Sequence, residues 1–362
     1  MTVLERGFTY VEVLIAIAIL FAATGTSLWV TASGQRLARS QGEATDLHQR
    51  TRVGVDRLRN DLALAGTGAP AGPHSGSLSA HLAPLVPART GVRLPDPPLS
   101  AFVDRVSIVY MAEGAWPSPL TVDMASPLEP LPISATAPGC PLTGLCGFSE
   151  GTRALVLDTR GVGAGHDVFT VTGVAGALAH DSPNPPLQRS YEAGTSIVVP
   201  VVHRVYYFDR AGRRLVVYDG YQGDMPLIDH LVDLRFRFFA DRLASSVSRP
   251  ADGSASCVYD AGSPAVPRLE DFGGAGLYEL SSAQMTDGPF CGTGPGAFDG
   301  DLLRIRLVRV TMRLEAAADD VRGSGVLFAR PGRSSSGDSF VPDYEVTFDV
   351  APRNMLPAMS PR

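Results

Sequence analysis

The sequence predicts an α+β protein in which a long N-terminal α-helix packs on a large, antiparallel, β-rich head. Two observations support this fold class. Residues 8–65 contain no proline and carry first an apolar run and then a helical spacing of apolar side chains. Beyond residue 100, apolar and polar residues alternate in short runs, which is typical of strands. With 362 residues, of which 44% are hydrophobic and 19% charged, the chain is long enough to bury a sizeable core.

Residues 8–32 form an apolar segment whose only charged side chain is Glu12. As a helix with ~1.5 Å rise per residue, this segment would cross the ~30 Å hydrocarbon layer of a bilayer. A secretory signal peptide, a plain membrane anchor and a segment that leaves the membrane to pack in an assembly all fit this length. A charge in a membrane helix costs roughly 2.5–3.5 kcal/mol at mid-depth and less near the edge, so Glu12 needs a partner.

Such a partner arises if the chain is cleaved between Gly7 and Phe8. The cut frees an α-amine at Phe8, which is mostly protonated at neutral pH. Glu12 and this amine lie along one rigid helix, so Glu12 is expected to bind the amine of a neighbouring, axially shifted copy. The resulting hypothesis is that subunits can assemble only after this cleavage.

The stretch RGFTYVEVLIAIAIL, residues 6–20, resembles the N-terminal processing and methylation motif of type IV pilins and type II secretion pseudopilins. Gly7 matches the residue before the cleavage point. Phe8 matches the first mature residue, whose amine is N-methylated in the family, and Glu12 matches the acid at the fifth mature position. The resemblance implies that a prepilin peptidase removes residues 1–7 as a leader peptide.

Residues 33–65 are predicted to continue the helix as an amphipathic stem. Apolar positions recur there at steps of three and four, as on one face of an α-helix, at Leu47, Thr51, Val55, Leu58, Leu62 and Ala65. The charged residues between them are interpreted as a solvated face: Arg50, Arg52, Asp56, Arg57, Arg59 and Asp61. Gly66 and Gly68 then end the helix, and residues 66–100, rich in glycine and proline, are interpreted as a linker.

Residues 101–362 are predicted to form the head. Its strand-like runs occupy 106–110, 153–158, 167–174, 196–208, 213–220, 231–239, 301–316 and 345–350. Residues 209–212, between two of these runs, favour a hairpin. Within 301–316 the apolar parity switches, which indicates a β-bulge near residues 307–308. The arginines of that run are interpreted as a solvated face, namely Arg304, Arg306, Arg309 and Arg313.

A second, looser resemblance covers pieces of the chain between residues 54 and 354. GVDRLRNDLALAG, QMTDGPFC, LLRIRLVRVTMRLEA and VPDYEVTFDVAPRN are similar to stretches of large minor pilins of the PilW type. This resemblance implies a minor, low-abundance subunit. A head of this size favours a place at the tip or in an initiating complex, because it would crowd the neighbours above it.

The cysteines form a near pair, Cys140 and Cys146, and a farther pair, Cys257 and Cys291. Four cysteines allow three connectivities, and pairing within each pair is favoured because a crosslink stabilises loops that lack packing. A zinc site has little support, since there is no CxxC and no histidine at ligand spacing beside either pair. Disulfides place the bulk of the chain outside the cytosol.

The chain shows no convincing catalytic motif, and it is not expected to be an enzyme or to hold a cofactor. Residues 160–167, RGVGAGHD, contain GxGxG but precede a strand-like run instead of a helix, so they are interpreted as a turn. Asp299 and Asp301 flank a glycine and could help to bind calcium, although such acids more often form turns. No metal site is therefore predicted. The net charge of −6 also argues against a nucleic-acid partner.

Together these features predict a single-pass inner-membrane subunit with its head in the periplasm, which later enters a pilus or pseudopilus at the cell surface. The expected partners are other pilins and minor pilins, the prepilin peptidase, the inner-membrane assembly platform and, before assembly, membrane lipid. A minor pseudopilin of a type II secretion system is the first alternative. A membrane-anchored extracytoplasmic binding or enzymatic domain unrelated to filaments is the second, and it predicts an intact N-terminus or a cut well after Ala22.

Overall fold

The structure is a computed structural model, and it describes residues 9–68, 77–111, 116–136, 140, 145–180, 187–247, 249, 253–335 and 337–355. The chain divides into two compact units. The anchor unit consists of the N-terminal part of the chain up to Arg50 together with Leu314–Tyr344. The head unit consists of Thr51–Arg313 together with the residues from Glu345 onward.

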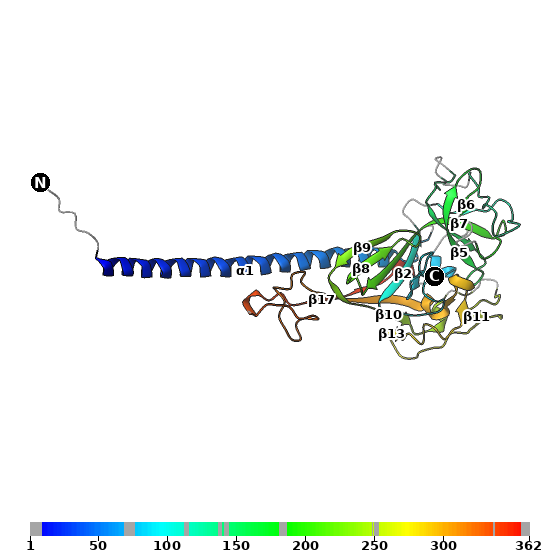
Figure 1. Cartoon of the computed structure of the whole chain (residues 1–362). Helices are drawn as coiled ribbons and strands as arrows, with labels where there is room; N and C mark the ends of the chain where they lie inside the picture. Colours follow the sequence, from blue (N-terminus) through cyan, green and yellow to red (C-terminus); the bar gives the residue numbers. More distant parts are fainter. Residues whose placement is uncertain are drawn as a thin grey trace. The chain divides into compact units, whose positions relative to one another are not determined.

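In the described part of the chain, a single α-helix, α1 (Tyr10–Leu64), is followed by strands and short 3-10 helices (Figure 1). The strands are β1 (Leu85–Val86), β2 (Arg105–Met111), β3 (Ser118–Pro119), β4 (Arg153–Asp158), β5 (His166–Gly173), β6 (Ala179–His180), β7 (Ser196–Asp209), β8 (Arg214–Tyr218), β9 (Asp224–Asp229), β10 (Leu231–Asp241), β11 (Tyr259–Asp260), β12 (Val266–Pro267), β13 (Leu277–Leu280), β14 (Phe290–Cys291), β15 (Phe298–Asp299), β16 (Ile305–Leu314) and β17 (Tyr344–Val350). The 3-10 helices are η1 (Leu78–Ala80), η2 (Ala244–Ser246), η3 (Gly294–Gly296), η4 (Gly300–Arg304), η5 (Gly337–Ser339) and η6 (Arg353–Met355).

The predicted long helix is confirmed, and α1 runs through Gly25 and Gly34 without interruption. It ends where Gly66 takes a positive φ of 76°. This conformation is cheap for glycine and ends many helices, because it turns the chain so that the last carbonyl groups find donors. The N–H of Thr67 donates to the carbonyl of Leu64 at 2.9 Å.

The larger sheet is antiparallel and is built around β7. The N-terminal half of β7 pairs with β4, and its C-terminal half pairs with β2 and β8. In the described chain this sheet has nine strands, with the path β1-β2-β7-β4-β5-β6 and with β3, β8 and β9 attached beside it. The predicted hairpin is confirmed, because Asp209 pairs with Arg214 across its turn. β4 and β5 also pair, so the GxGxG segment between them is a turn, as predicted.

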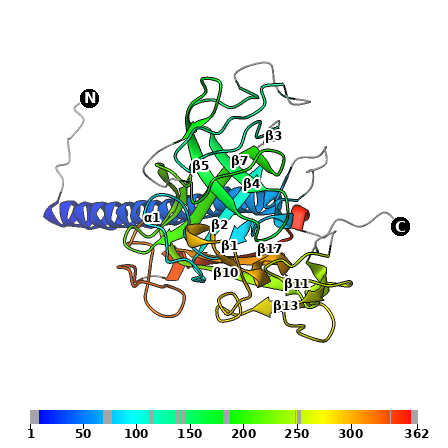
Figure 2. The same cartoon turned by 90° about the vertical axis from the view of Figure 1, so that its right-hand side faces the viewer.

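A second antiparallel sheet has the order β13-β10-β16-β17 among the described strands. Figure 2 shows β10 and β13 in the lower part of the head, below the strands of the larger sheet. The two sheets meet where the N–H of Phe236 in β10 donates to the carbonyl of Val103 at 2.6 Å, just before β2. Phe236, Val308 and Val106 are almost fully buried, so the core of the head lies between the sheets.

The apolar pattern predicts a β-bulge near residues 307–308, which would explain why the buried side chains switch faces within residues 301–316. The structure gives a different cause. Residues up to Arg304 form the 3-10 helix η4, and β16 begins only at Ile305. From Arg306 onward, alternate residues are buried. The switch therefore comes from a helix-to-strand boundary, since a 3-10 turn changes the direction in which successive side chains point.

The interpretation of Arg304 and Arg306 as solvated is wrong. Arg304 has no exposed surface and Arg306 is 7% exposed. The Arg304 guanidinium lies 4.2 Å from the centroid of Phe272, pairs with Asp301 and donates to the carbonyl of Glu270 at 2.7 Å. A buried guanidinium is tolerable when carboxylate and carbonyl acceptors satisfy it in this way.

The last turns of α1 pack into the head. Leu58 and Leu62 are fully buried, and Gly54 lies against β9 and β16. A Cβ on Gly54 would clash with Ile228 Cδ1, so a larger residue here would force the Ile228 side chain to move, and glycine lets the helix lie close to the sheet. The segment interpreted as a linker contains η1 and β1, and Leu85 within it is fully buried.

In the anchor unit, the segment Leu314–Tyr344 is fixed to α1 and to itself. The N–H of Ala317 donates to the Glu43 carboxylate at 2.9 Å, and the rings of His48 and Tyr344 lie 4.6 Å apart. Figure 1 shows this segment, orange to red, alongside the blue helix. We call it the return loop. Within the return loop, the fully buried Glu315 forms ion pairs with both Arg322 and Arg330.

Candidate functional site

Helix α1 begins in a capping box formed by Thr9 and Glu12. The Glu12 N–H donates to Thr9 Oγ1 at 3.3 Å, and the Glu12 carboxylate accepts from both the N–H and the hydroxyl of Thr9 at 2.8 Å. The first turn of a helix leaves its N–H groups without intrahelical acceptors, and this reciprocal pair supplies them. The cleavage residues Gly7 and Phe8 lie outside the described residues.

Glu12 is bound but not neutralised. Its described partners are the neutral donors of Thr9, and no described residue places a cation within ion-pair distance of it. Neutral donors stabilise a carboxylate without cancelling its charge.

The surface of α1 around Glu12 is apolar and uncovered. The stretch is long and apolar enough to cross a membrane, and none of it is buried in the structure. Hydroxyl groups in the same stretch bond to carbonyls one turn earlier, as Thr24 does to Leu20 at 2.7 Å and Ser27 to Ala23 at 2.9 Å. Because these hydroxyls are satisfied within the helix, they do not prevent burial in lipid or in a helix bundle.

Asp61 joins α1 to the larger sheet of the head. Its carboxylate accepts from the hydroxyl of Tyr110 in β2 at 3.0 Å and from that of Tyr206 in β7 at 2.5 Å, and it pairs with Arg57 at 3.4 Å. Asp61 is 3% exposed, so its assignment to the solvated face is wrong. Burial, with the nearby Asp61 charge, raises the pKa of Tyr110 to about 12, which keeps this phenol protonated and donating.

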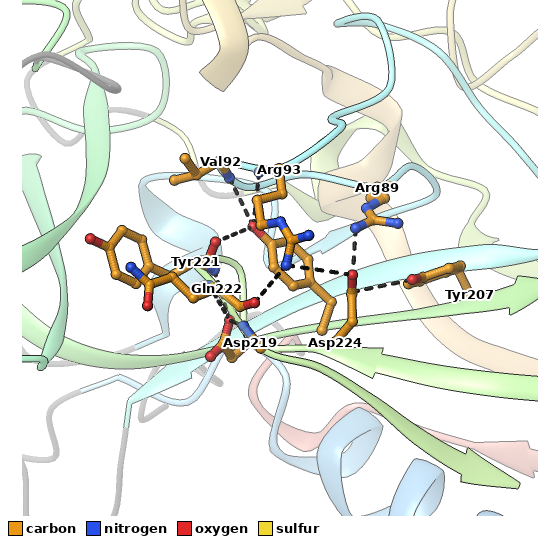
Figure 3. Close-up of polar contacts among 10 residues, drawn as sticks. Arg89, Val92, Arg93, Tyr207, Asp219, Tyr221, Gln222 and Asp224 are labelled. Atoms are coloured by element: carbon orange, nitrogen blue, oxygen red, sulfur yellow. Dashed lines mark hydrogen bonds and ion pairs between the residues drawn. The ribbon is translucent and has the colours of Figure 1, made fainter.

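A loop of the head is held against β7 and β8 by Arg89 (Figure 3). The guanidinium of Arg89 lies 4.4 Å from the ring centroid of Tyr207 and 4.9 Å from that of Tyr218, and it pairs with Asp224 at 3.3 Å. Stacking between two rings together with an ion pair fixes a guanidinium in one place. These contacts tie the loop at Arg89 to β7 and β8.

The same loop passes very close to the end of β8. Tyr218 Oη accepts from the backbone N–H groups of Val92 and Arg93 at 3.1 and 2.9 Å. Gly91 has a φ of 114°, and a Cβ there would lie 2.7 Å from the carbonyl oxygen of Gly220. Glycine is thus required for this close approach.

Behind this loop the head contains a cavity of about 140 Å³. Apolar side chains such as Val109 line it, together with the polar side chains of Thr90, Arg153, Asp167 and His203. Arg153 donates to the Thr170 hydroxyl at 2.7 Å, and no described carboxylate lies within ion-pair distance of it. His203 shares a hydrogen bond of 2.9 Å with Thr90, and burial lowers its pKa to about 3, so it is neutral.

Asp167, on the cavity wall, gives the head a testable pH dependence. Burial raises the pKa of Asp167 to about 6. Two hydrogen bonds to its carboxylate, from Tyr191 Oη at 2.8 Å and from the Gln188 N–H at 3.0 Å, act in the opposite direction but are weaker than the effect of burial. A raised pKa means that this group stabilises the fold fully below its ordinary pKa and that this contribution is lost as the pH rises through about 6.

Asp167→Asn does not titrate and keeps an acceptor for Tyr191. We therefore expect the stability of the variant, relative to that of the wild type, to rise by about 2 kcal/mol between about pH 4 and about pH 8. Urea unfolding of the full chain in detergent, at a series of pH values, measures this difference. A difference that stays constant over that range would contradict the assignment.

The calcium candidates Asp299 and Asp301 lie together with Asp287, with ligand oxygens within 4.8 Å of one another. Asp299 already accepts from the N–H groups of Gly288 and Asp301 at 2.6 and 2.8 Å. Asp301 pairs with the buried Arg304. The chain's own donors thus satisfy these two carboxylates, as in a turn supported by an ion pair.

The described residues contain two disulfides, Cys140–Cys146 and Cys257–Cys291. This is the local pairing that the sequence favours. The second bond joins residues 34 apart and ties the segment before β11 to β14. Closing a loop of that length restricts the unfolded chain and so stabilises the head.

Comparison with known proteins finds no relative of this chain, because no family model, curated protein or solved structure matches it. Of the predicted site residues, Glu12 lies at the helix start, whereas the two disulfides and the acidic cluster lie in the head.

Proposed function

We propose that the chain is a minor-pilin-like structural subunit. A prepilin peptidase cleaves it between Gly7 and Phe8, and the mature subunit takes part in initiating or capping the assembly of a type IV pilus. Before assembly it lies in the inner membrane as a single-pass protein with its head in the periplasm. Its partners are other pilins and minor pilins, the peptidase and the inner-membrane assembly platform.

The observation that carries this proposal is Glu12, whose carboxylate has no cation within ion-pair distance among the described residues. It lies on a helix segment that is apolar and exposed. A membrane anchor has no use for such a charge. Capping does not explain it either, because a glutamine at the same position closes a capping box equally well. A charge that costs free energy in an apolar environment and is unnecessary for the helix start is explained by a cation that another subunit brings.

Assembly through α1 also explains why the apolar surface of the anchor unit is uncovered in the structure. An apolar surface of this extent must be covered by lipid or by protein. Contacts between the lower half of one helix and the upper half of the next are heterologous, and such contacts propagate as a helix instead of closing. A minor pseudopilin of a type II secretion system has the same chemistry and is the first alternative.

The second alternative, an anchored extracytoplasmic binding domain, is favoured by the cavity of the head. Arg153 lies on its wall without an ion-pair partner among the described residues, and a guanidinium in that state suits a small anion. This alternative needs neither cleavage after Gly7 nor a filament.

Mass spectrometry of the purified chain separates these proposals. We expect the mature chain to begin at N-methylated Phe8. Gly7→Val is expected to retain residues 1–7, because it replaces the glycine that the resemblance places directly before the cut. Gly34→Val is the matched control, since a Cβ at Gly34 meets no atom within 4 Å, and it should be processed normally. A wild-type chain that begins at Met1 overturns the proposed function.

A further inference from the structure

The anchor unit contains a second, separate pocket, formed where the return loop meets α1. It has a volume of about 220 Å³, far above the ~10–15 Å³ that one water molecule needs. Arg36 and Arg39 line it from α1, and Arg333 and three serines line it from the return loop. Arg36 and Arg39 are three residues apart and so lie on one face of the helix.

The pocket carries a net positive charge among its described groups. Asp320 lines it and pairs with Arg39 at 3.4 Å, while Asp319 pairs with Arg333 at 2.8 Å. Arg36 has no carboxylate within ion-pair distance in the described chain. Three arginines and two aspartates leave a charge of +1, which matches a singly charged anion.

The return loop is held firmly enough to form one side of a binding site. Glu315, fully buried, binds both Arg322 and Arg330, and the N–H of Arg333 donates to the carbonyl of Asp319 at 2.7 Å. The hydroxyls of Ser334 and Ser339 lie 3.1 Å apart. Hydroxyl groups beside guanidinium groups are the usual donors to phosphate oxygens.

The position of the pocket along α1 places it at a membrane surface. If residues 8–32 span the hydrocarbon layer, Arg36 lies about 6 Å beyond it and Arg39 about 10 Å beyond it, at ~1.5 Å per residue. The headgroup layer is ~5–8 Å deep on each side. Side chains on a helix lean toward its N-terminus, which here is toward the membrane, and long arginines reach further in that direction.

We propose that this pocket binds the headgroup of an anionic phospholipid, such as phosphatidylglycerol, on the surface of the bilayer from which the head projects. Arg36, Arg39 and Arg333 bind the phosphodiester, and the serine hydroxyls donate to its remaining oxygens. The site requires that α1 lies in a bilayer, which is part of the proposed function. It requires neither cleavage nor assembly.

The test uses the full chain in nanodiscs that contain equal amounts of phosphatidylglycerol and phosphatidylcholine with the same acyl chains. Native mass spectrometry then counts the lipids that stay bound when the disc is released. We expect the wild type to retain phosphatidylglycerol over phosphatidylcholine by roughly tenfold. The double variant Arg36→Gln/Arg39→Gln and the single variant Arg333→Gln should both lose this preference.

Arg52→Gln is the matched control, because it removes the same charge from an exposed arginine of the same helix, and it should keep the wild-type preference. If the helix variant loses the preference but Arg333→Gln keeps it, the proposed pocket is refuted. Attraction of anionic lipid to the basic residues of α1 would then be enough to explain the binding. Complete displacement of the lipid by excess inorganic phosphate also overturns the proposal, in favour of a free-anion site. An N-terminus at Met1 would refute the proposed function without affecting these readings.

Discussion

Glu12→Gln is expected to remove the subunit from filaments while leaving its helix intact. Glutamine accepts the same hydrogen bonds from Thr9 at the N3 position, so the capping box survives. What disappears is the negative charge that would bind the α-amine of Phe8 in a neighbouring copy. The share of the chain recovered in sheared surface filaments, relative to the membrane fraction, measures the effect, and we expect a loss of at least tenfold.

The matched control for this experiment is Thr9→Val. It removes the hydroxyl that closes the capping box but keeps the charge of Glu12 and the hydrogen bond from the backbone N–H of residue 9. We expect this variant to enter filaments at nearly the wild-type level. Normal incorporation of Glu12→Gln would show that the charge is not used, and an equal loss in both variants would show that the effect of Glu12→Gln is not specific to the charge.

Asp61→Ala is expected to give the largest loss of stability in the head. The substitution leaves the hydroxyls of Tyr110 and Tyr206 without their shared acceptor, and it leaves Arg57 without its carboxylate. Breaking a buried charge network from one side typically costs about 3–5 kcal/mol. Chemical unfolding of the full chain in detergent, followed by tyrosine fluorescence, measures this loss.

Asp56→Ala serves as the control for Asp61→Ala. Asp56 lies on the same helix, its side chain is 61% exposed, and it pairs with Arg52 at 3.7 Å. Exposed pairs of this kind contribute little, so a change within about 0.5 kcal/mol is expected. Equal effects of the two substitutions would contradict the role assigned to Asp61.

The features that the sequence predicts well are those that depend on local pattern. A run without proline and with apolar residues at helical spacing has one structural solution, and α1 follows it from Tyr10 to Leu64. The alternating runs around residues 209–212 likewise become β7 and β8. The signature T-x-x-E at Thr9 and Glu12 is a further local signal in the sequence, and it marks the start of the helix.

The features that the sequence does not reveal depend on partners far away in the chain. Asp61 and Arg304 occupy positions that look solvated, because charged residues usually are. Both are buried because a distant segment supplies the complement: two tyrosine hydroxyls for Asp61, and the carbonyl of Glu270 for Arg304. The pocket beside Arg36 is hidden for the same reason, since its other side comes from residues nearly 300 positions later.

The division of the chain also decides how a soluble fragment for crystallisation or ligand screening should be cut. Starting such a fragment at the first residue of the head unit, Thr51, would delete Glu43 and His48, which contact Ala317 and Tyr344. The return loop would then be expressed without its support and would expose surfaces prone to aggregation. A fragment that starts near residue 33 lacks the apolar membrane-spanning segment but keeps the contacts of Glu43 and His48 with the return loop. It is therefore the better choice for biochemical work.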